Sequence, residues 1–171
     1  GKMAMAFDAS LQASDEALMV LYGNGDHGAA RVLTLRFTPL ALRVAARVLG
    51  DGAEAEDVAQ EAMLRLWRVA PDWRQGEAKV STWLYKVVMN LCTDRLRRRR
   101  GVGLDDVAEP EDETPGVLDR MVDGDRLQAL QIALDALPER QRQAVVLRHL
   151  EGLTNPEIAQ ERKVAIYDLL E

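Results

Sequence analysis

One stretch of this sequence carries side chains suited to binding bases and phosphates together. Trp83, Lys86, Asn90, Asp94 and Arg97 are spaced three or four residues apart, which places them on one face of a helix. An aromatic ring can stack on a base, an amide can pair with a base edge, and basic side chains can hold phosphate. The spacing alone also fits an ordinary polar surface, so both interpretations stay open at this point.

A second candidate binding face lies on the helix predicted for residues 53–69. One side of this helix carries only apolar residues, and the opposite side carries polar residues together with one leucine. The apolar set is Val58, Ala59, Ala62, Met63 and Leu66, and the opposite set is Asp57, Gln60, Glu61 and Leu64. The apolar side is predicted to face the core. The acidic side is either solvated surface or a docking face for a partner.

The residue types that enzymes use to make and break bonds are scarce. The chain has no glycine-rich phosphate loop and no Ser/His/Asp set with a suitable base. Its two histidines, His27 and His149, and its one cysteine, Cys92, are too few for a zinc site of the usual Cys/His type. We therefore expect no enzymatic activity, no cofactor and no metal ion, and we interpret Cys92 as a small core residue.

The charges are distributed unevenly along the chain. The 171 residues include 22 basic and 28 acidic side chains, for a net charge of −6. Five arginines fall within residues 95–100, whereas nine acidic residues and a single base, Arg120, lie between Asp105 and Asp125. A basic block followed by an acidic stretch with proline and glycine indicates a domain end and a linker. We expect a first domain at 1–100, an acidic flexible linker at 101–124 and a second domain at 125–171.

The hydrophobic periodicity is helical almost throughout. We predict helices at 14–23 with Ser14 as the cap, at 26–49 with Pro39 kinking or splitting it, at 53–69, and from a Ser81 or Thr82 cap to about 100. After the linker we predict helices at 125–137 and 138–150, a turn at Gly152, and a short helix opened by a Thr154/Glu157 capping box. The last two helices form the order expected of a helix-turn-helix. The predicted fold is all-α, with two small helical domains.

No membrane or export segment is evident. The chain lacks a run of about 20 apolar residues, and its first residues lack the apolar core of a signal peptide. We expect a cytoplasmic protein without direct membrane insertion.

Three short sequence motifs follow one another along the chain. They are Ala55–Glu61 with Leu64–Arg68, Ser81–Lys86 continuing through Asn90 to Arg99, and Leu137–Arg142 with Gly152 and Glu157–Ala159. In this order they resemble the extracytoplasmic-function (ECF) group of the bacterial sigma-70 family, over about residues 14–160. The resemblance implies a region 2 helical bundle and a region 4 helix-turn-helix domain. It also implies a transcription initiation factor that binds core RNA polymerase and promoter DNA, and usually an anti-sigma factor.

The resemblance also implies roles for individual residues. Those expected to bind polymerase are Asp57, Gln60, Glu61, Leu64 and Arg65. Those expected to bind the melted −10 promoter strand are Trp73, Arg74, Lys79, Ser81, Thr82, Trp83, Lys86, Asn90, Arg95, Arg97 and Arg98. Within the second set, the loop from Trp73 to Lys79 is expected to cap a flipped-out base. Trp83 and Asn90 are expected to supply the stacking and polar contacts.

The sequence after Gln160 departs from the family pattern. A recognition helix with hydroxyl and basic residues is expected there, but the stretch to Glu171 has few bases. Region 4 is therefore expected to be incomplete and not to read the −35 element. An alternative interpretation is a sigma mimic or decoy that sequesters polymerase or an anti-sigma factor without activating promoters.

Overall fold

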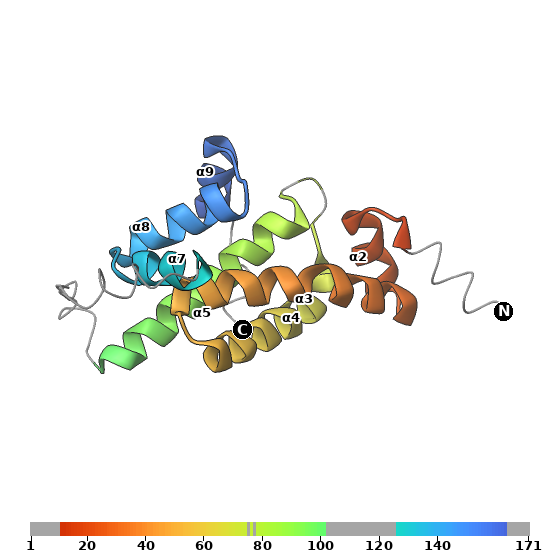
Figure 1. Cartoon of the computed structure of the whole chain (residues 1–171). Coiled ribbons are helices and arrows are strands. Elements are labelled where there is room, and N and C mark those ends of the chain that lie inside the picture. Colours follow the sequence, from red (N-terminus) through yellow and green to blue (C-terminus); the bar gives the residue numbers. More distant parts are fainter. Residues whose placement is uncertain (1–10, 75, 77, 102–125, 164–171) are drawn as a thin grey trace.

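Helices joined by short turns make up the structure, a computed structural model that describes residues 11–74, 76, 78–101 and 126–163 (Figure 1). Within these ranges there is no strand, so the predicted all-α class is confirmed. In the same ranges, no helix combines the length and the apolar composition needed to cross a membrane. The predicted acidic linker at 101–124 lies outside the described residues except for Gly101, and so does most of the stretch after Gln160.

The first group of helices begins where the sequence supplies side-chain caps. Its members are α2 (Asp15–Gly23), α3 (His27–Leu49), α4 (Gly52–Val69), the 3-10 turn η1 (Ala70–Asp72) and α5 (Val80–Arg100). The side chains of Ser14, Asp26 and Asp51 each accept a hydrogen bond from the backbone N–H three residues later, at 3.0–3.1 Å. Such bonds satisfy donors that have no partner inside the helix.

Two local expectations need correction. Of the two alternatives predicted for Pro39, a split is excluded, because α3 is one helix from His27 to Leu49. The carbonyl left without a helical donor belongs to Leu35, a residue that is 58% exposed. Helix α5 begins at Val80 with Lys79 as its N-cap and no side-chain cap bond, rather than after a Ser81 or Thr82 cap. Val80, the first residue of the helix, is buried.

The second group of helices follows the predicted helix-turn-helix order. It comprises α7 (Arg126–Asp135), α8 (Glu139–Val145), the π-helical turn η3 (Val146–Leu150) and α9 (Asn155–Lys163). The Thr154 N–H donates to Glu157 Oε1 at 2.8 Å, and the Glu157 N–H donates to Thr154 Oγ1 at 3.3 Å. This reciprocal pair is the predicted capping box.

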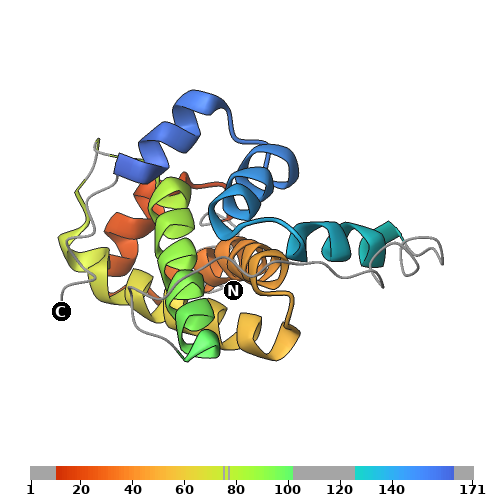
Figure 2. The ribbon, with the colours of Figure 1, turned by 90° about the vertical axis from the view of Figure 1, so that its left-hand side faces the viewer.

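Both groups of helices share one hydrophobic core. Leu134, Val146, Leu147 and Ile158 from the second group belong to the same buried cluster as the residues of α2–α5. Helices α8 and α9 lie across α3 and α5 from α4, as the two perpendicular views show (Figures 1 and 2). The core helices α3 and α5 are therefore covered on two sides.

Arg142 of α8 joins the C-terminal ends of two other helices. Its guanidinium donates to the carbonyl oxygens of Val48, Leu134 and Leu137 at 2.8, 2.9 and 3.0 Å. Terminal carbonyls of a helix have no intrahelical donor, and a cation is favourable at that end of the helix. A side chain of α8 thus caps the C-terminal ends of α3 and α7.

Gly50 is favoured by its backbone conformation, and side chains of α7 approach it closely. It ends α3 with a φ of +68°, and a Cβ there would lie 2.9 Å from Asp135 Oδ1 and 3.3 Å from Gln131 Nε2. Gly101 ends α5 with a φ of +62°, but none of the described atoms lies within 4 Å of the corresponding Cβ position.

We predict that Gly50→Ala destabilises the protein more than Gly101→Ala. The Gly101 variant bears only the backbone strain of alanine in the left-handed region, about 1 kcal/mol. The Gly50 variant must in addition displace the Asp135 and Gln131 side chains. Urea unfolding of both variants measures the difference, and equal losses in the free energy of unfolding would contradict the close approach of α7.

Candidate functional site

The exposed side of α4 brings together the residues that the sequence assigns to docking. Asp57, Gln60 and Leu64 are exposed, and the side chain of Leu64 stands 41% open to solvent. Glu61 and Arg65 form an ion pair along the same side at 3.0 Å. The opposite stripe of α4 is buried, as predicted. An exposed leucine among charges is suited to a protein contact, because charge can orient a partner while the apolar group contributes affinity.

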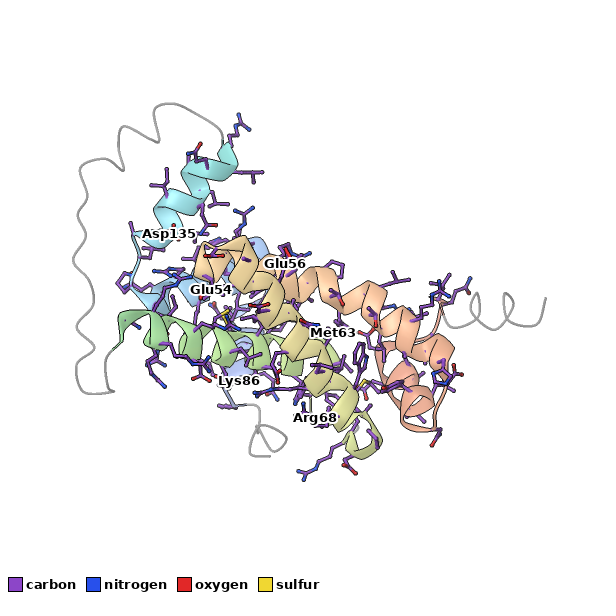
Figure 3. The ribbon with its side chains drawn as sticks, turned by 90° about the horizontal axis from the view of Figure 1, so that it is seen from below. Glu54, Glu56, Met63, Arg68, Lys86 and Asp135 are labelled. Atoms are coloured by element: carbon purple, nitrogen blue, oxygen red, sulfur yellow. The ribbon has the colours of Figure 1, made fainter. Side chains whose placement is uncertain are left out.

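An apolar hollow of about 280 Å³ lies beside this row, between α3 and α4. It is lined by Thr38, Leu42, Glu56, Ala59, Gln60, Met63, Leu64 and Trp67. Figure 3 looks at the molecule from below, with α4 in front and both Glu56 and Met63 labelled on it. Sequence reasoning missed Thr38, Leu42, Glu56 and Trp67. A usable signal existed, since Leu35 and Leu42 are two turns apart on α3, outside its buried stripe, and both are exposed.

A second hollow, of about 380 Å³, lies on the other side of the row, between α4 and α5. Its lining joins Asp57, Gln60, Glu61, Leu64 and Arg65 of α4 to Arg95 and Arg98 of α5, with Val58, Leu91 and Asp94. Arg95 lies 3.6 Å from Asp57 in an exposed ion pair. Exposed pairs of this kind contribute little stability, so their members can exchange partners at low cost. The predicted docking residues and two of the predicted phosphate-binding arginines therefore meet at one hollow.

The tryptophans lie where the sequence did not predict them. Trp83 is 1% exposed, and its ring meets that of Trp73 edge to face, with centroids 6.0 Å apart and an interplanar angle of 86°. Trp73 also donates its indole N–H to Glu16 at 3.2 Å. This placement corrects the expectation that Trp83 shares an exposed face with Lys86 and Asn90. Thr82 is likewise buried at 7% exposure. Neither side chain is therefore exposed for contact with a DNA strand.

The remaining predicted strand-binding residues lie at or near the surface. Arg74, Lys79 and Arg98 are exposed, whereas Ser81, Lys86, Asn90, Arg95 and Arg97 are half-buried. Several of them already have partners: Arg97 lies 3.8 Å from Asp94, Lys79 lies 3.7 Å from Glu157, and Lys86 donates to the Arg162 carbonyl at 3.3 Å. The last two partners belong to α9. Part of the predicted nucleic-acid face is thus in contact with the second group of helices.

Cys92 is a core residue, as the sequence indicates. Its side chain is fully buried in α5, and burial raises the pKa of the thiol from about 9 to about 12. Because the thiolate is the reactive form, a buried thiol with this pKa is inert near neutral pH.

We predict that Cys92 does not react with a soluble aromatic disulfide reagent at pH 8 until the chain unfolds. The same raised pKa makes stability depend on pH. Below about pH 9 the thiol is protonated in both states, whereas between about 9 and 12 only the folded state retains the proton. The contribution of Cys92 to stability is therefore lost as the pH rises through that window. Thiol titration with and without urea, at pH 8 and pH 10, checks this, and rapid native labelling at pH 8 would contradict it.

Comparison with known proteins accounts for both groups of helices. The family described as Sigma-70 region 2 matches residues 33–102, and Sigma-70, region 4 matches residues 127–165. The ECF RNA polymerase sigma factor SigM of Mycobacterium tuberculosis is 35% identical, over 95% of this chain and 80% of its own length. The RNA polymerase sigma-H factor of Pseudomonas aeruginosa is 32% identical, over 86% and 82% respectively. The ECF RNA polymerase sigma-E factor of Escherichia coli is 29% identical, over 88% and 83%.

Proposed function

The chain belongs to the ECF group of sigma-70 RNA polymerase sigma factors, which direct transcription initiation at promoters, and we propose that it works through two faces, one on α4 and one on α5. Membership implies binding to core RNA polymerase and to promoter DNA. The proposal assigns polymerase docking to α4 and capture of the melted −10 strand to α5 with the preceding loop. The observation that carries it is the row of exposed acidic and apolar side chains on α4, beside the arginines of α5.

Polymerase docking on α4 rests on the combination of charge and exposed apolar surface. The acidic residues Asp57 and Glu61 can orient the helix against a basic partner. Leu64 projects between the two hollows, and Leu42 lines the apolar one from α3. A partner side chain that enters the apolar hollow would bury these leucines, and burial of apolar area is the main source of affinity at such a contact.

We predict that Asp57→Arg combined with Glu61→Arg lowers affinity for core polymerase by at least about tenfold, since both charges then repel a basic partner. Leu42→Asp is expected to have a similar effect by placing a carboxylate in the apolar hollow. Fluorescence anisotropy with labelled chain measures the affinity. Asp72→Arg is the control, because it reverses an exposed charge in η1, outside α4, and it should change affinity by less than about twofold. Wild-type affinity for polymerase in both the Asp57→Arg/Glu61→Arg variant and the Leu42→Asp variant would refute the docking assignment.

Strand capture on α5 rests on the basic and amide side chains that lie at its surface. Lys79, Lys86, Arg95, Arg97 and Arg98 can hold phosphates, and Asn90 can pair with a base edge. The loop between Trp73 and Lys79 supplies the pocket for a flipped base in this proposal. Trp83 contributes by packing against Trp73 and not by stacking on a base.

We predict that Asn90→Ala lowers promoter opening by about tenfold while leaving polymerase affinity unchanged, since only a base-edge hydrogen bond is lost. Opening is measured with a fluorescent base at the −10 position, in the presence of core polymerase. Asn24→Ala, the same substitution at the end of α2, is the control. Full opening by the Asn90 variant would show the base-contact role to be wrong. Tight polymerase binding by the wild-type chain without any opening would instead favour the decoy interpretation.

Three further attributes belong to the same proposal. The factor has no covalent chemistry of its own, because polymerase supplies the reaction and the chain supplies recognition. It acts in the cytoplasm, where bacterial polymerase meets the chromosome. An anti-sigma factor is its proposed regulator, on the strength of the family resemblance.

A further inference from the structure

A buried carboxylate joins the second group of helices to the first. Glu151 follows η3, and its side chain is only 2% exposed. Arg43 of α3 donates Nε–H and Nη2–H to its two oxygens, both at 2.6 Å, and the Tyr85 hydroxyl of α5 donates at 2.8 Å. We call these three residues the latch. Its members are far apart in sequence, and Arg43 and Glu151 are separated by 108 positions.

We call the packing of α8 and α9 against α3 and α5 the closed arrangement. The latch stabilises it, because a carboxylate is costly to bury without charged and polar donors. The bond to Glu151 raises the pKa of Arg43, and burial together with that bond raises the pKa of Tyr85. Both groups therefore remain protonated and able to donate. Arg43 itself is 51% exposed, so it can be solvated when the latch opens. Breaking the latch therefore mainly weakens the contact between the two groups of helices.

The helices held by the latch lie along one stripe of α5. Four residues at seven-residue spacing, two turns apart, form this stripe, and each contacts the second group. The contacts are Lys79 with Glu157 at 3.7 Å, Lys86 with the Arg162 carbonyl at 3.3 Å, Thr93 with Gln143 at 3.0 Å, and Arg100 with Glu139 at 2.9 Å. Figure 3 labels Lys86 on α5, with α9 behind it.

The pairing partners have the charge of a nucleic-acid backbone. Glu139 and Glu157 meet basic residues of the stripe, and Glu151 meets Arg43. A carboxylate on a lysine or arginine uses the donors that a phosphate would use. The exposed side of α4 lies on the other side of α3 and α5, away from α8 and α9 (Figures 1 and 2).

We propose that region 4 inhibits strand capture within the same chain, with Glu151 latching α8 and α9 over the stripe that carries the proposed phosphate-binding residues Lys79 and Lys86. This inference rests on the proposed function, because it concerns the regulation of that face. The closed chain can dock on polymerase through α4, but it must release the latch before Lys79 and Lys86 can hold a DNA strand. Release of the latch is a separate step between polymerase docking and strand capture.

Two variants that change net charge in opposite directions test the latch in the full-length chain. Glu151→Gln removes a negative charge and Arg43→Gln removes a positive one, and neither residue belongs to the proposed binding faces. Both should raise the affinity of the free chain for a labelled single-stranded −10 oligonucleotide library by about tenfold, since each breaks the same charged hydrogen bonds. Asp135→Asn is the matched control. It removes an exposed negative charge from α7, in the same group of helices, and the Asp135 side chain bonds Gln131 and no residue of the α5 stripe, so affinity should change by less than about twofold.

A second measurement follows the closed state without DNA. A zero-length carbodiimide joins the Lys79 amine to the Glu157 carboxylate, and mass spectrometry detects the product. Its yield should be high in the wild type, several-fold lower in both latch variants, and zero in Glu157→Gln. If Glu151→Gln fails to fold, the test rests on Arg43→Gln. The Arg43 side chain is half exposed, so its replacement is expected to leave the fold intact.

The outcomes separate the inference from the proposed function. Strand affinities that follow net charge, rising for Glu151→Gln and falling for Arg43→Gln, would overturn the latch alone. Unchanged affinities and cross-link yields in both variants would do the same. Strand binding by no variant, with or without core polymerase, would overturn the proposed function and this inference together.

Discussion

Helix α5 has buried residues all around it, and no single layer of helices can cover them. Ten of its residues are buried, among them Trp83, Val87 and Cys92. Helices α3 and α4 pack on it from one direction, and α9 packs from another. Because burial of apolar surface is the dominant favourable contribution to folding, this helix draws both halves of the chain together. The candidate nucleic-acid residues occupy the margins of the most buried helix of the described chain.

This constraint separates the two proposed faces. The α4 row borders the core on one side only, so its charges and Leu64 stay available to a partner while the fold is complete. The α5 stripe borders the surface that α9 uses for packing, so the intramolecular contacts and the proposed DNA contacts involve the same side chains, Lys79 and Lys86. The proposed docking face on α4 is available to a partner in the folded chain. The proposed strand-binding face on α5 also packs against the second group of helices.

Features set by neighbours in sequence were predictable, and features set by distant packing were not. The Ser14 cap, the Thr154/Glu157 capping box and the amphipathic α4 depend on residues within a turn or two, and the structure bears them out. Trp83 was misplaced because its burial depends on Trp73 and on helices from elsewhere in the chain. The apolar hollow needs Leu42 and Leu64 from two helices, and the Arg43–Glu151 contact spans more than half the chain. Helical spacing within one segment carries no information about such pairs.

The pairing of Arg100 and Lys79 with glutamates has a consequence for how the protein responds to ionic strength. A free cationic side chain on a DNA-binding surface gains affinity largely by releasing counterions condensed on the DNA, and this gain weakens as salt rises. Arg100 and Lys79 are already paired with Glu139 and Glu157. A phosphate that binds such a cation must displace the glutamate, and the free energy of breaking that ion pair offsets part of the gain. Rising salt also loosens the glutamate pairs. The two effects oppose each other, so under the proposed function the strand affinity of this chain would depend less steeply on salt than its number of phosphate contacts alone predicts.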